Sequence, residues 1–419
     1  MFTSFSTALS ALDATSTAID VVGNNLANMN STGFKTSELS FSNLVTQSLG
    51  AGLGTTQVGF GTATPLTTAN FTQGAIQTSG GLLNGAISGS GFFVVQDPST
   101  GNTEYTRAGN FQTDSNGNLE SATGDYVQGW TAQGVTPGTI DTNGPIGNIV
   151  VPVGSLKAPV ATANMTESLN LNSASTPTTP AFSTPITIYD SLGTSHVLTL
   201  SFTNTGAGAW SYSANLAAAD CADGQADQVA TGNLAFLPNG QMDFTNTANP
   251  IAFTMPTLTD GAASGGTVTW NMENKDGTGM ITQINGASAS SASTQDGSPA
   301  AQLTSVGLGT GGTILAQYSD GSQQTVGQVA LASIRNPDTL IANGNNNYQL
   351  SELSATPNIG VPGTGGRGTI QGGSLESSNV DIATEFTNLI VYQRSYEAAG
   401  KVVTTANQMS QDTINLITG

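Results

Sequence analysis

Residues 2–28 read FTSFSTALSALDATSTAIDVVGNNLAN, and this stretch decides the organisation of the chain. Its apolar side chains recur in alternating steps of three and four, the spacing of an amphipathic helix or a coiled-coil seam. The stripe consists of Phe2, Phe5, Leu9, Leu12, Ile19, Val22 and Leu26. The opposite face is Ser, Thr, Ala and Asn, so it lacks the ion pairs that support a lone helix. Because isolated helices need packing to persist, we expect this segment to pair with a partner.

The far end of the chain carries a second helical pattern that supplies such a partner. Ser378-Asn379-Val380-Asp381 indicates a helix start, with Ser378 as the expected cap. Apolar positions at helical spacing follow at Ile382, Phe386, Leu389, Tyr396, Val403, Ile414 and Ile417, and a second stripe comprises Ile390, Val402, Ala406, Met409 and Leu416. Two stripes predict contact with more than one neighbour. We interpret both ends as surfaces that pack between copies of the chain, the alternative being core helices of an ordinary bundle.

Between the ends the periodicity changes to two, which predicts β-strands joined by hairpins. Strands are expected at 91–96, 104–107, 186–189, 196–202 and 328–332, with two-residue turns at Asn116-Gly117, Asn239-Gly240 and Asp320-Gly321. Clusters of Gly, Pro and small polar residues predict linkers near 50–54, 173–180, 287–298 and 363–368.

The predicted fold class is mainly β with terminal α-helices. The N- and C-terminal helices pair in a coiled-coil-like manner, so the β body between them is discontinuous in sequence. The predicted parts are a helical polymerisation core of 1–28 plus 378–419, linking segments of 29–70 plus 364–377, an inner β domain of 71–160 plus 301–363, and an inserted outer β domain of 161–300.

Composition excludes several classes of function. Lys and Arg total 8 and Asp and Glu total 27 in 419 residues, a formal net charge of −19. That balance excludes a nucleic-acid-binding surface and disfavours docking on an anionic membrane. No apolar run reaches the roughly 18 residues of a transmembrane helix, so we expect no membrane insertion. The first residues lack a basic region followed by an apolar run, so we expect no cleaved secretory signal.

Candidate chemical motifs fail on their context. The single Cys221 and the single His196 exclude a disulfide framework and a Cys/His zinc site. Cys221 is expected to be an inert surface or loop thiol, and His196 a hydrogen-bonded or exposed strand residue rather than a triad base. Gly363–Gly368 matches G-x-G-x-x-G but opens no helix, and Asp114 begins a hairpin turn, since Leu119 stands where a calcium loop needs Gly. We predict no catalytic, cofactor-binding or metal site, and no enzyme activity.

Several short segments resemble the rod and hook axial proteins of the bacterial flagellum. They are Leu9–Leu12, Gly23–Asn28, Ser31–Lys35, Ile87–Val95, Tyr105–Phe111, Leu375–Asp381 and Tyr392–Glu397. The family motif positions within the terminal segments are Asn24, Asn25, Ala27, Asn28, Gly33, Phe34, Ser378, Asn379, Val380, Asp381, Gln393 and Arg394. Two further segments, 186–193 and 326–332, are similar to segments around the outer insertion of hook-type members, which the shorter rod proteins lack.

The resemblance implies a structural subunit of the flagellar hook, self-assembling head-to-tail into a curved tube that transmits motor torque from rod to filament as a universal joint. The implied partners are further copies of the chain, the distal rod, hook cap and hook–filament junction proteins, and the export apparatus. It also implies no cofactor and an extracellular place in the flagellum, reached by type III export without signal cleavage. The alternatives are a rod subunit and a secreted β-rich adhesin. A β-solenoid body would need a repeat of about 20–50 residues, and we find none.

Overall fold

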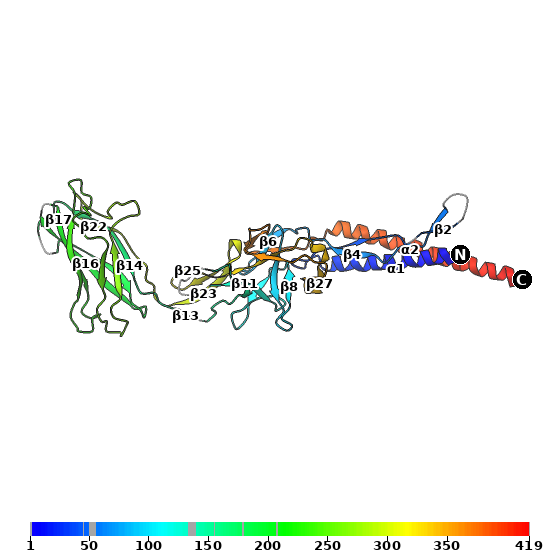
Figure 1. The fold of residues 1–419 in the computed structure, drawn as a ribbon, viewed down its shortest axis with the longest axis horizontal. Helices are drawn as coiled ribbons and strands as arrows, with labels where there is room; N and C mark the ends of the chain where they lie inside the picture. The colour runs from blue at the N-terminus through cyan, green and yellow to red at the C-terminus, as the bar shows by residue number, and fades with distance from the viewer. Residues whose placement is uncertain are drawn as a thin grey trace. The chain divides into compact units, whose positions relative to one another are not determined.

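The computed structural model describes residues 2–44, 46–49, 56–132, 140–154, 156–177, 180–206 and 208–418. The chain divides into two compact units. Unit 1 comprises Met1–Val153, Ser305–Gln317 and Gln323–Gly419, and unit 2 comprises Gly154–Thr304 and Tyr318–Ser322. The chain is mostly β-sheet with one α-helix at each end, which confirms the predicted fold class (Figure 1). The linker expected at 50–54 lies outside the described residues, and the bounds of the four predicted parts stay a prediction.

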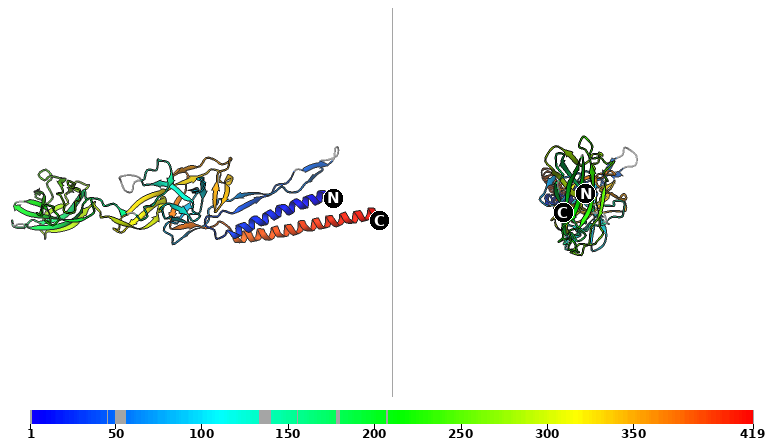
Figure 2. Two further views of the ribbon diagram at one scale, coloured as in Figure 1. Left: turned by 90° about the horizontal axis from the view of Figure 1, so that it is seen from below. Right: turned by 90° about the vertical axis from the view of Figure 1, so that its left-hand side faces the viewer.

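The two helices belong to unit 1 and pack against each other. Helix α1 spans Phe2–Ala27 and helix α2 spans Ile382–Thr418. Figure 2 shows them side by side with both chain termini at the same end of the pair, so the helices run antiparallel. This arrangement confirms that the ends of the chain form a pair.

The expected cap of the second helix is wrong by three residues. Asp381, not Ser378, stands directly before α2, and its Oδ1 accepts a hydrogen bond from the Thr384 backbone N–H at 3.0 Å. A serine hydroxyl or a carboxylate at this position can accept a hydrogen bond from an otherwise unpaired N–H. The carboxylate also interacts favourably with the positive end of the helix dipole. Ser378 instead accepts from the Val380 N–H at 3.3 Å in the preceding turn.

Unit 1 takes its β-strands from two distant parts of the chain, and they form one large sheet and separate two-stranded sheets. Its described strands are β1 (Ser37–Ser40), β2 (Thr46–Leu49), β3 (Thr56–Gly59), β4 (Leu66–Ala69), β5 (Ile76–Thr78), β6 (Gly85–Ser88), β7 (Phe92–Gln96), β8 (Thr103–Thr106), β9 (Phe111–Thr113), β10 (Leu119–Ser121), β11 (Tyr126–Thr131), β12 (Gly147–Asn148), β24 (Thr313–Tyr318), β25 (Gln323–Val329), β26 (Leu331–Ser333), β27 (Ile341–Gly344), β28 (Asn347–Gln349), β29 (Asn358–Gly360), β30 (Thr369–Gly372) and β31 (Ser374–Glu376). The main path runs β24-β25-β11-β7-β8-β28-β27, antiparallel throughout. The strands that precede unit 2 in the sequence (β11, β7 and β8) therefore lie between strands that follow it.

Two short ladders carry the chain from this sheet to α2. Strand β30 pairs antiparallel with β6, and β31 pairs antiparallel with β5. The second ladder sets Glu376 opposite Ile76, five residues before the Asp381 cap. The start of α2 is thus held to the β body by backbone hydrogen bonds.

Unit 2 contains two sheets that share one core. Its strands are β13 (Leu156–Lys157), β14 (Asn164–Asn172), β15 (Phe182–Tyr189), β16 (Ser195–Gly206), β17 (Ala209–Leu216), β18 (Gln228–Ala235), β19 (Ile251–Thr254), β20 (Thr267–Asn271), β21 (Ile281–Ile284), β22 (Ala289–Gln295) and part of β23 (Ala301–Leu308). One sheet has the order β15-β16-β17-β18, and the other has β19-β20-β14-β21 with β22 also on β14. Buried and outward positions alternate along β16 and β17, as strands with one buried face require. Trp270 packs edge-on against Tyr212 and Phe202 of the facing sheet, with ring centroids 5.3 and 6.4 Å apart.

Most local β predictions are confirmed, but the predicted linker at 287–298 and the predicted surface position of Cys221 are wrong. The turns at Asn116-Gly117 and Asp320-Gly321 connect β9 to β10 and β24 to β25. The linker expected at 287–298 instead contains β22, because Ser and Ala backbones complete the ladder on β14 although their side chains favour no strand. Cys221 is buried in the core of unit 2 rather than at the surface, and its backbone forms a bridge with Leu258. Burial, and after it the nearby carboxylates, raises the pKa of this thiol.

A substitution at Gly109 tests how tightly unit 1 is packed. A Cβ at Gly109 would lie against the Gly85 carbonyl oxygen, far inside van der Waals contact. We expect Gly109→Ala to lower the free energy of unfolding by about 1–3 kcal/mol, the usual range for overpacking, measured by urea unfolding. Gly80→Ala is the matched control, because no heavy atom lies within 4 Å of its added methyl. Equal effects of the two substitutions would contradict this packing.

Candidate assembly interface

The face by which α1 packs in the chain is made of small side chains. Ala8, Ala14, Ala18 and Val22 are buried, and Ala18 has no exposed surface. Small residues let two helix backbones approach closely, but they bury little apolar area each. The buried face of α1 therefore contributes little apolar burial within the chain.

The large apolar residues predicted for α1 lie mostly beside this face. Val22 is buried, Leu12, Ile19 and Leu26 are half-buried, and Phe5 and Leu9 are exposed, Leu9 at 54%. Nine residues separate Leu9 from Ala18, which at about 100° per residue is roughly half a turn around the helix. The side chain of Phe2 lies outside the described residues. An apolar flank of α1 thus faces away from the buried face of this helix.

Helix α2 leaves apolar side chains exposed along both predicted stripes. Leu389, Val403 and Ala406 are half-buried. The exposed ones are Ile382, Phe386, Tyr396 and Ile414 of the first stripe, and Ile390, Val402, Met409 and Leu416 of the second. Leu416 is 83% exposed, and the side chain of Ile417 lies outside the described residues. At 37 residues against 26, α2 is longer than α1 by roughly 16 Å at 1.5 Å per residue, so its last turns extend beyond α1.

A buried ionic cluster fixes the base of the helix pair. Both carboxylate oxygens of Glu376 are used: Oε1 lies 2.6 Å from Lys35 Nζ, and Oε2 lies 3.2 Å from Arg107 Nη1. The Glu376 and Lys35 side chains have no exposed surface, and Gly74 N–H also donates to Oε1 at 2.8 Å. Burial lowers the pKa of Lys35, and the hydrogen bond and charge of Glu376 oppose that shift. Arg107 also stacks over the Phe92 ring, 5.3 Å from its centroid.

Two asparagines join the helix ends to the linking segments. Asn25, near the end of α1, exchanges two hydrogen bonds of 3.0 Å with the Ser37 backbone and donates to Glu385 Oε1 of α2 at 3.0 Å. Asn379 accepts from the Thr36 N–H at 2.8 Å and donates to the Asn70 carbonyl at 2.9 Å. These amides offer donors and acceptors at once, which suits a junction of four backbone segments.

Gly33 and Phe34 of the motif belong to the same junction. Gly33 N–H donates to the Glu376 carbonyl at 2.8 Å, and its φ of 68° lies in the left-handed region. A Cβ there would come within 2.6 Å of the Ala108 nitrogen, so glycine is required. Phe34 is buried beside it, and its carbonyl accepts from the Asn379 N–H at 3.4 Å.

The other motif residues do not gather in this junction to the same degree. Asn24, Ala27 and Asp381 are exposed, Asn28, Ser378 and Val380 are half-buried, and Gln393 and Arg394 are exposed on α2. The sequence patterns do not predict the ion pairs of Lys35 and Arg107 with Glu376. The available signal was scarcity: with 8 Lys and Arg in 419 residues, two that fall in motif segments deserve a buried partner.

The two segments that match chemical motifs in the sequence, at Asp114 and at Gly363–Gly368, form a turn and a loop connection. Asp114 Oδ1 accepts the N–H groups of Asn116 and Asn118 at 2.8 and 2.7 Å, which closes the β9–β10 hairpin. Gly363–Gly368 forms the connection from β29 to β30, closed by a 2.8 Å hydrogen bond from Gly363 N–H to the Gly368 carbonyl. No α-helix in the described part of the chain is long and apolar enough to cross a membrane.

Comparisons with known proteins match most of the chain to flagellar rod and hook proteins. Family models match as Flagella basal body rod protein (residues 5–35), Flagellar hook protein FlgE/F/G D1 domain (86–167), Flagellar basal body protein FlaE D2 domain (155–298) and Flagellar basal body rod FlgEFG protein C-terminal (371–416). The Flagellar hook protein FlgE of Escherichia coli is 33% identical, with 98% of this chain and 99% of that protein aligned.

Similar proteins of the same name occur in other bacteria. That of Salmonella typhimurium is 32% identical over 99% of this chain and 100% of its own length, and that of Borreliella burgdorferi is 31% identical over the same shares. The crystal structure of Helicobacter pylori flagellar hook protein FlgE2 has a similar fold, with a TM-score of 0.52 and 14% identity. It covers 70% of this chain and 99% of its own.

The ionic cluster gives a first prediction for this site. Glu376→Gln keeps the shape of the side chain but leaves Lys35 and Arg107 buried without a counter-charge. We expect the free energy of unfolding to fall by about 3–5 kcal/mol, followed by the loss of helical ellipticity in urea. Glu120→Gln is the control, since among the described residues the Glu120 carboxylate accepts only an exposed hydrogen bond from Gln112 and the change should cost under about 1 kcal/mol. Equal losses of unfolding free energy in the two variants would contradict a larger contribution of Glu376 to stability.

The pH dependence of the helix junction follows from Glu385. Burial, and then the charges of Asp381 and Glu38, raise the pKa of Glu385, while its hydrogen bond from Asn25 opposes the shift. A raised folded-state pKa means that this group stabilises the fold fully below its ordinary value of 4.5 and less as pH rises through the folded pKa.

We therefore expect Glu385→Gln, which keeps the acceptor for Asn25, to raise stability at neutral pH and to flatten the loss of stability between about pH 4.5 and 7. Urea unfolding at a series of pH values measures this. Glu397→Gln, an exposed change on the same helix, serves as control. A steeper pH dependence in Glu385→Gln than in the unaltered chain would contradict the assignment.

Proposed function

Because the chain belongs to the flagellar hook protein FlgE family and is a structural subunit of the hook, we propose that it assembles through its terminal helices, head-to-tail, into a curved tube. The observation that carries this proposal is the apolar surface left on α1 and α2, from Leu9 to Leu416. Monomeric proteins seldom expose many large apolar side chains close together. Burying each of them in a contact between copies would stabilise the assembly by about 1.5–3 kcal/mol. Neighbouring copies of the same helix pair are the proposed cover.

The geometry of the helix pair suits an open polymer. Each subunit presents apolar flanks on two sides of α2, and contacts that use different surfaces of identical copies generate helical assemblies when they do not close into a ring. The projecting end of α2, with Met409 and Leu416 exposed, offers a contact for the next copy along the axis. Low charge, 8% of all residues, keeps the desolvation cost of these contacts small.

We further propose the wider role that the family resemblance implies. The tube transmits torque from rod to filament while it bends, and its neighbours are the distal rod, the hook cap and the hook–filament junction proteins. Localisation is to the flagellum, and we propose export through the flagellar export apparatus to the cell exterior. The role is structural rather than catalytic. A rod subunit is not favoured, since hook proteins align over the whole chain, including the region 155–298.

A substitution on the exposed flank of α1 tests the assembly role. Leu9→Asp should raise the critical concentration for polymerisation at least about tenfold, the equivalent of about 1.4 kcal/mol per contact, because an apolar contact becomes a buried charge. The melting temperature of the dilute subunit should change little, since Leu9 is 54% exposed in it. Sedimentation and negative-stain electron microscopy measure the assembly.

Leu192→Asp is the matched control, because Leu192 is 56% exposed but belongs to unit 2. It should polymerise like the unaltered chain. If Leu9→Asp forms tubes at the unaltered critical concentration, the terminal helices are not the assembly surface.

A further inference from the structure

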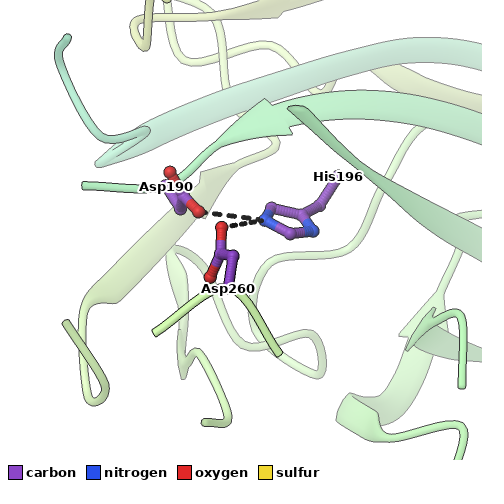
Figure 3. Close-up of side chains that lie close together, drawn as sticks. All are labelled: Asp190, His196 and Asp260. Carbon is purple, nitrogen blue, oxygen red and sulfur yellow. Dashed lines mark hydrogen bonds and ion pairs between the residues drawn. The ribbon is translucent and has the colours of Figure 1, made fainter. Parts of the chain in front are cut away.

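Three side chains that can bind metal ions, Asp190, His196 and Asp260, converge in unit 2 (Figure 3). His196 Nε2 lies 3.1 Å from Asp190 Oδ2 and 3.9 Å from Asp260 Oδ2, and the three ligand atoms lie within 4.8 Å of one another. Asp190 follows β15 and His196 is the second residue of β16, whereas Asp260 lies on the connection from β19 to β20. The cluster therefore joins the ends of the two sheets of the unit. The hydrogen-bonded strand histidine expected from the sequence is confirmed, but its acidic neighbours were not foreseen.

Each aspartate holds one oxygen in a turn and presents the other to the histidine. Asp190 Oδ1 accepts the Leu192 and Thr194 N–H groups at 2.8 and 2.9 Å, which leaves Oδ2 directed at His196. Asp260 Oδ1 accepts the Ala262 N–H at 3.0 Å, and its Oδ2 is the atom nearest Nε2. The backbone thus orients both carboxylates before any ligand arrives, as a preorganised site requires.

The second ring nitrogen is arranged as in a metal-binding histidine. His196 is 3% exposed, and its buried Nδ1 has no hydrogen-bond partner among the described residues, while Asp220 Oδ1 lies 3.5 Å away. A histidine that binds a metal through Nε2 carries its proton on Nδ1, and a carboxylate beside that proton fixes the tautomer and raises the basicity of Nε2. Asp220 occupies that place.

The charge of the cluster also calls for a cation. The carboxyl groups of Asp190, Asp220 and Asp260 surround the one imidazole of His196, with oxygens 3.1, 3.5 and 3.9 Å from its ring nitrogens. Two carboxylates at this separation repel unless a cation or a shared proton lies between them.

We propose that Asp190, His196 and Asp260 bind a divalent transition-metal ion, with Zn²⁺ as the best match to one imidazole and two carboxylates. Ligand atoms about 2.1 Å from a tetrahedral ion are about 3.4 Å apart, and the observed separations of 3.1 and 3.9 Å bracket that value. The Asp260 side chain is 24% exposed, so an ion enters from this side and keeps a water as its fourth ligand. The bound ion clamps the β15–β16 turn to the β19–β20 connection.

The histidine itself provides a test that needs no variant. His196 is the single histidine of the chain, so its imidazole signals in a nuclear magnetic resonance spectrum are unambiguous. Titration of the chelator-treated full chain with ZnCl₂ should shift these signals saturably at one ion per chain, and raise the melting temperature. Histidine signals that stay unchanged as Zn²⁺ is added would overturn the proposal.

Variants then assign the carboxylate ligand. In isothermal titration calorimetry, Asp260→Asn should weaken Zn²⁺ binding at least tenfold, because a neutral amide replaces an anionic ligand. Asp243→Asn is the matched control: Asp243 also holds a turn, accepting the Thr245 N–H at 3.0 Å, but it has no histidine beside it, so its binding should be unaltered. Cys221→Ser should also bind as the unaltered chain does. Loss of binding in Cys221→Ser, or equal binding in Asp260→Asn, would place the ion elsewhere and refute the site.

Discussion

A carboxylate buried between two cations is the constraint on which unit 1 depends. Glu376 has no exposed surface, so its charge is tolerable only because Lys35 and Arg107 approach it from opposite oxygens. Each partner arrives on a different segment: one after α1, one from the strand pair that includes β8, and the glutamate itself just before α2. Each of its two oxygens is taken by one of the two cations. The ion cluster thus sets where both helices leave the β body.

The helix pair then distributes its side chains against the usual rule. In an ordinary core the large apolar residues point inward, whereas here Ala8 and Ala18 are buried while Leu9 and Leu416 are exposed. The buried face of α1 is formed mostly by small side chains, and the large exposed residues remain available to other molecules. In a polymer this arrangement favours assembly, because the exposed apolar residues become buried only when copies of the chain pack together.

Sequence patterns predicted what depends on neighbours along the chain. The period of Phe5 to Leu26 marked α1, and Asn116-Gly117 marked a hairpin, because both signals act within a few residues. The cluster at Glu376 could not be predicted in this way, since Lys35 lies 341 positions from it and no local pattern links them. Burial of Cys221 and the meeting of His196 with Asp260 are likewise tertiary events. β22 escaped prediction because its backbone, not its Ser and Ala side chains, forms the ladder.

The central claim is that copies of the chain cover the apolar flanks of the paired terminal helices. Electron cryomicroscopy of tubes grown from the purified chain, at a resolution that shows side chains, tests it most directly. The account predicts that Leu9, Ile390 and Leu416 pack against α1 or α2 of neighbouring copies. A tube in which these side chains face open solvent, with copies joined through their β units alone, would contradict it.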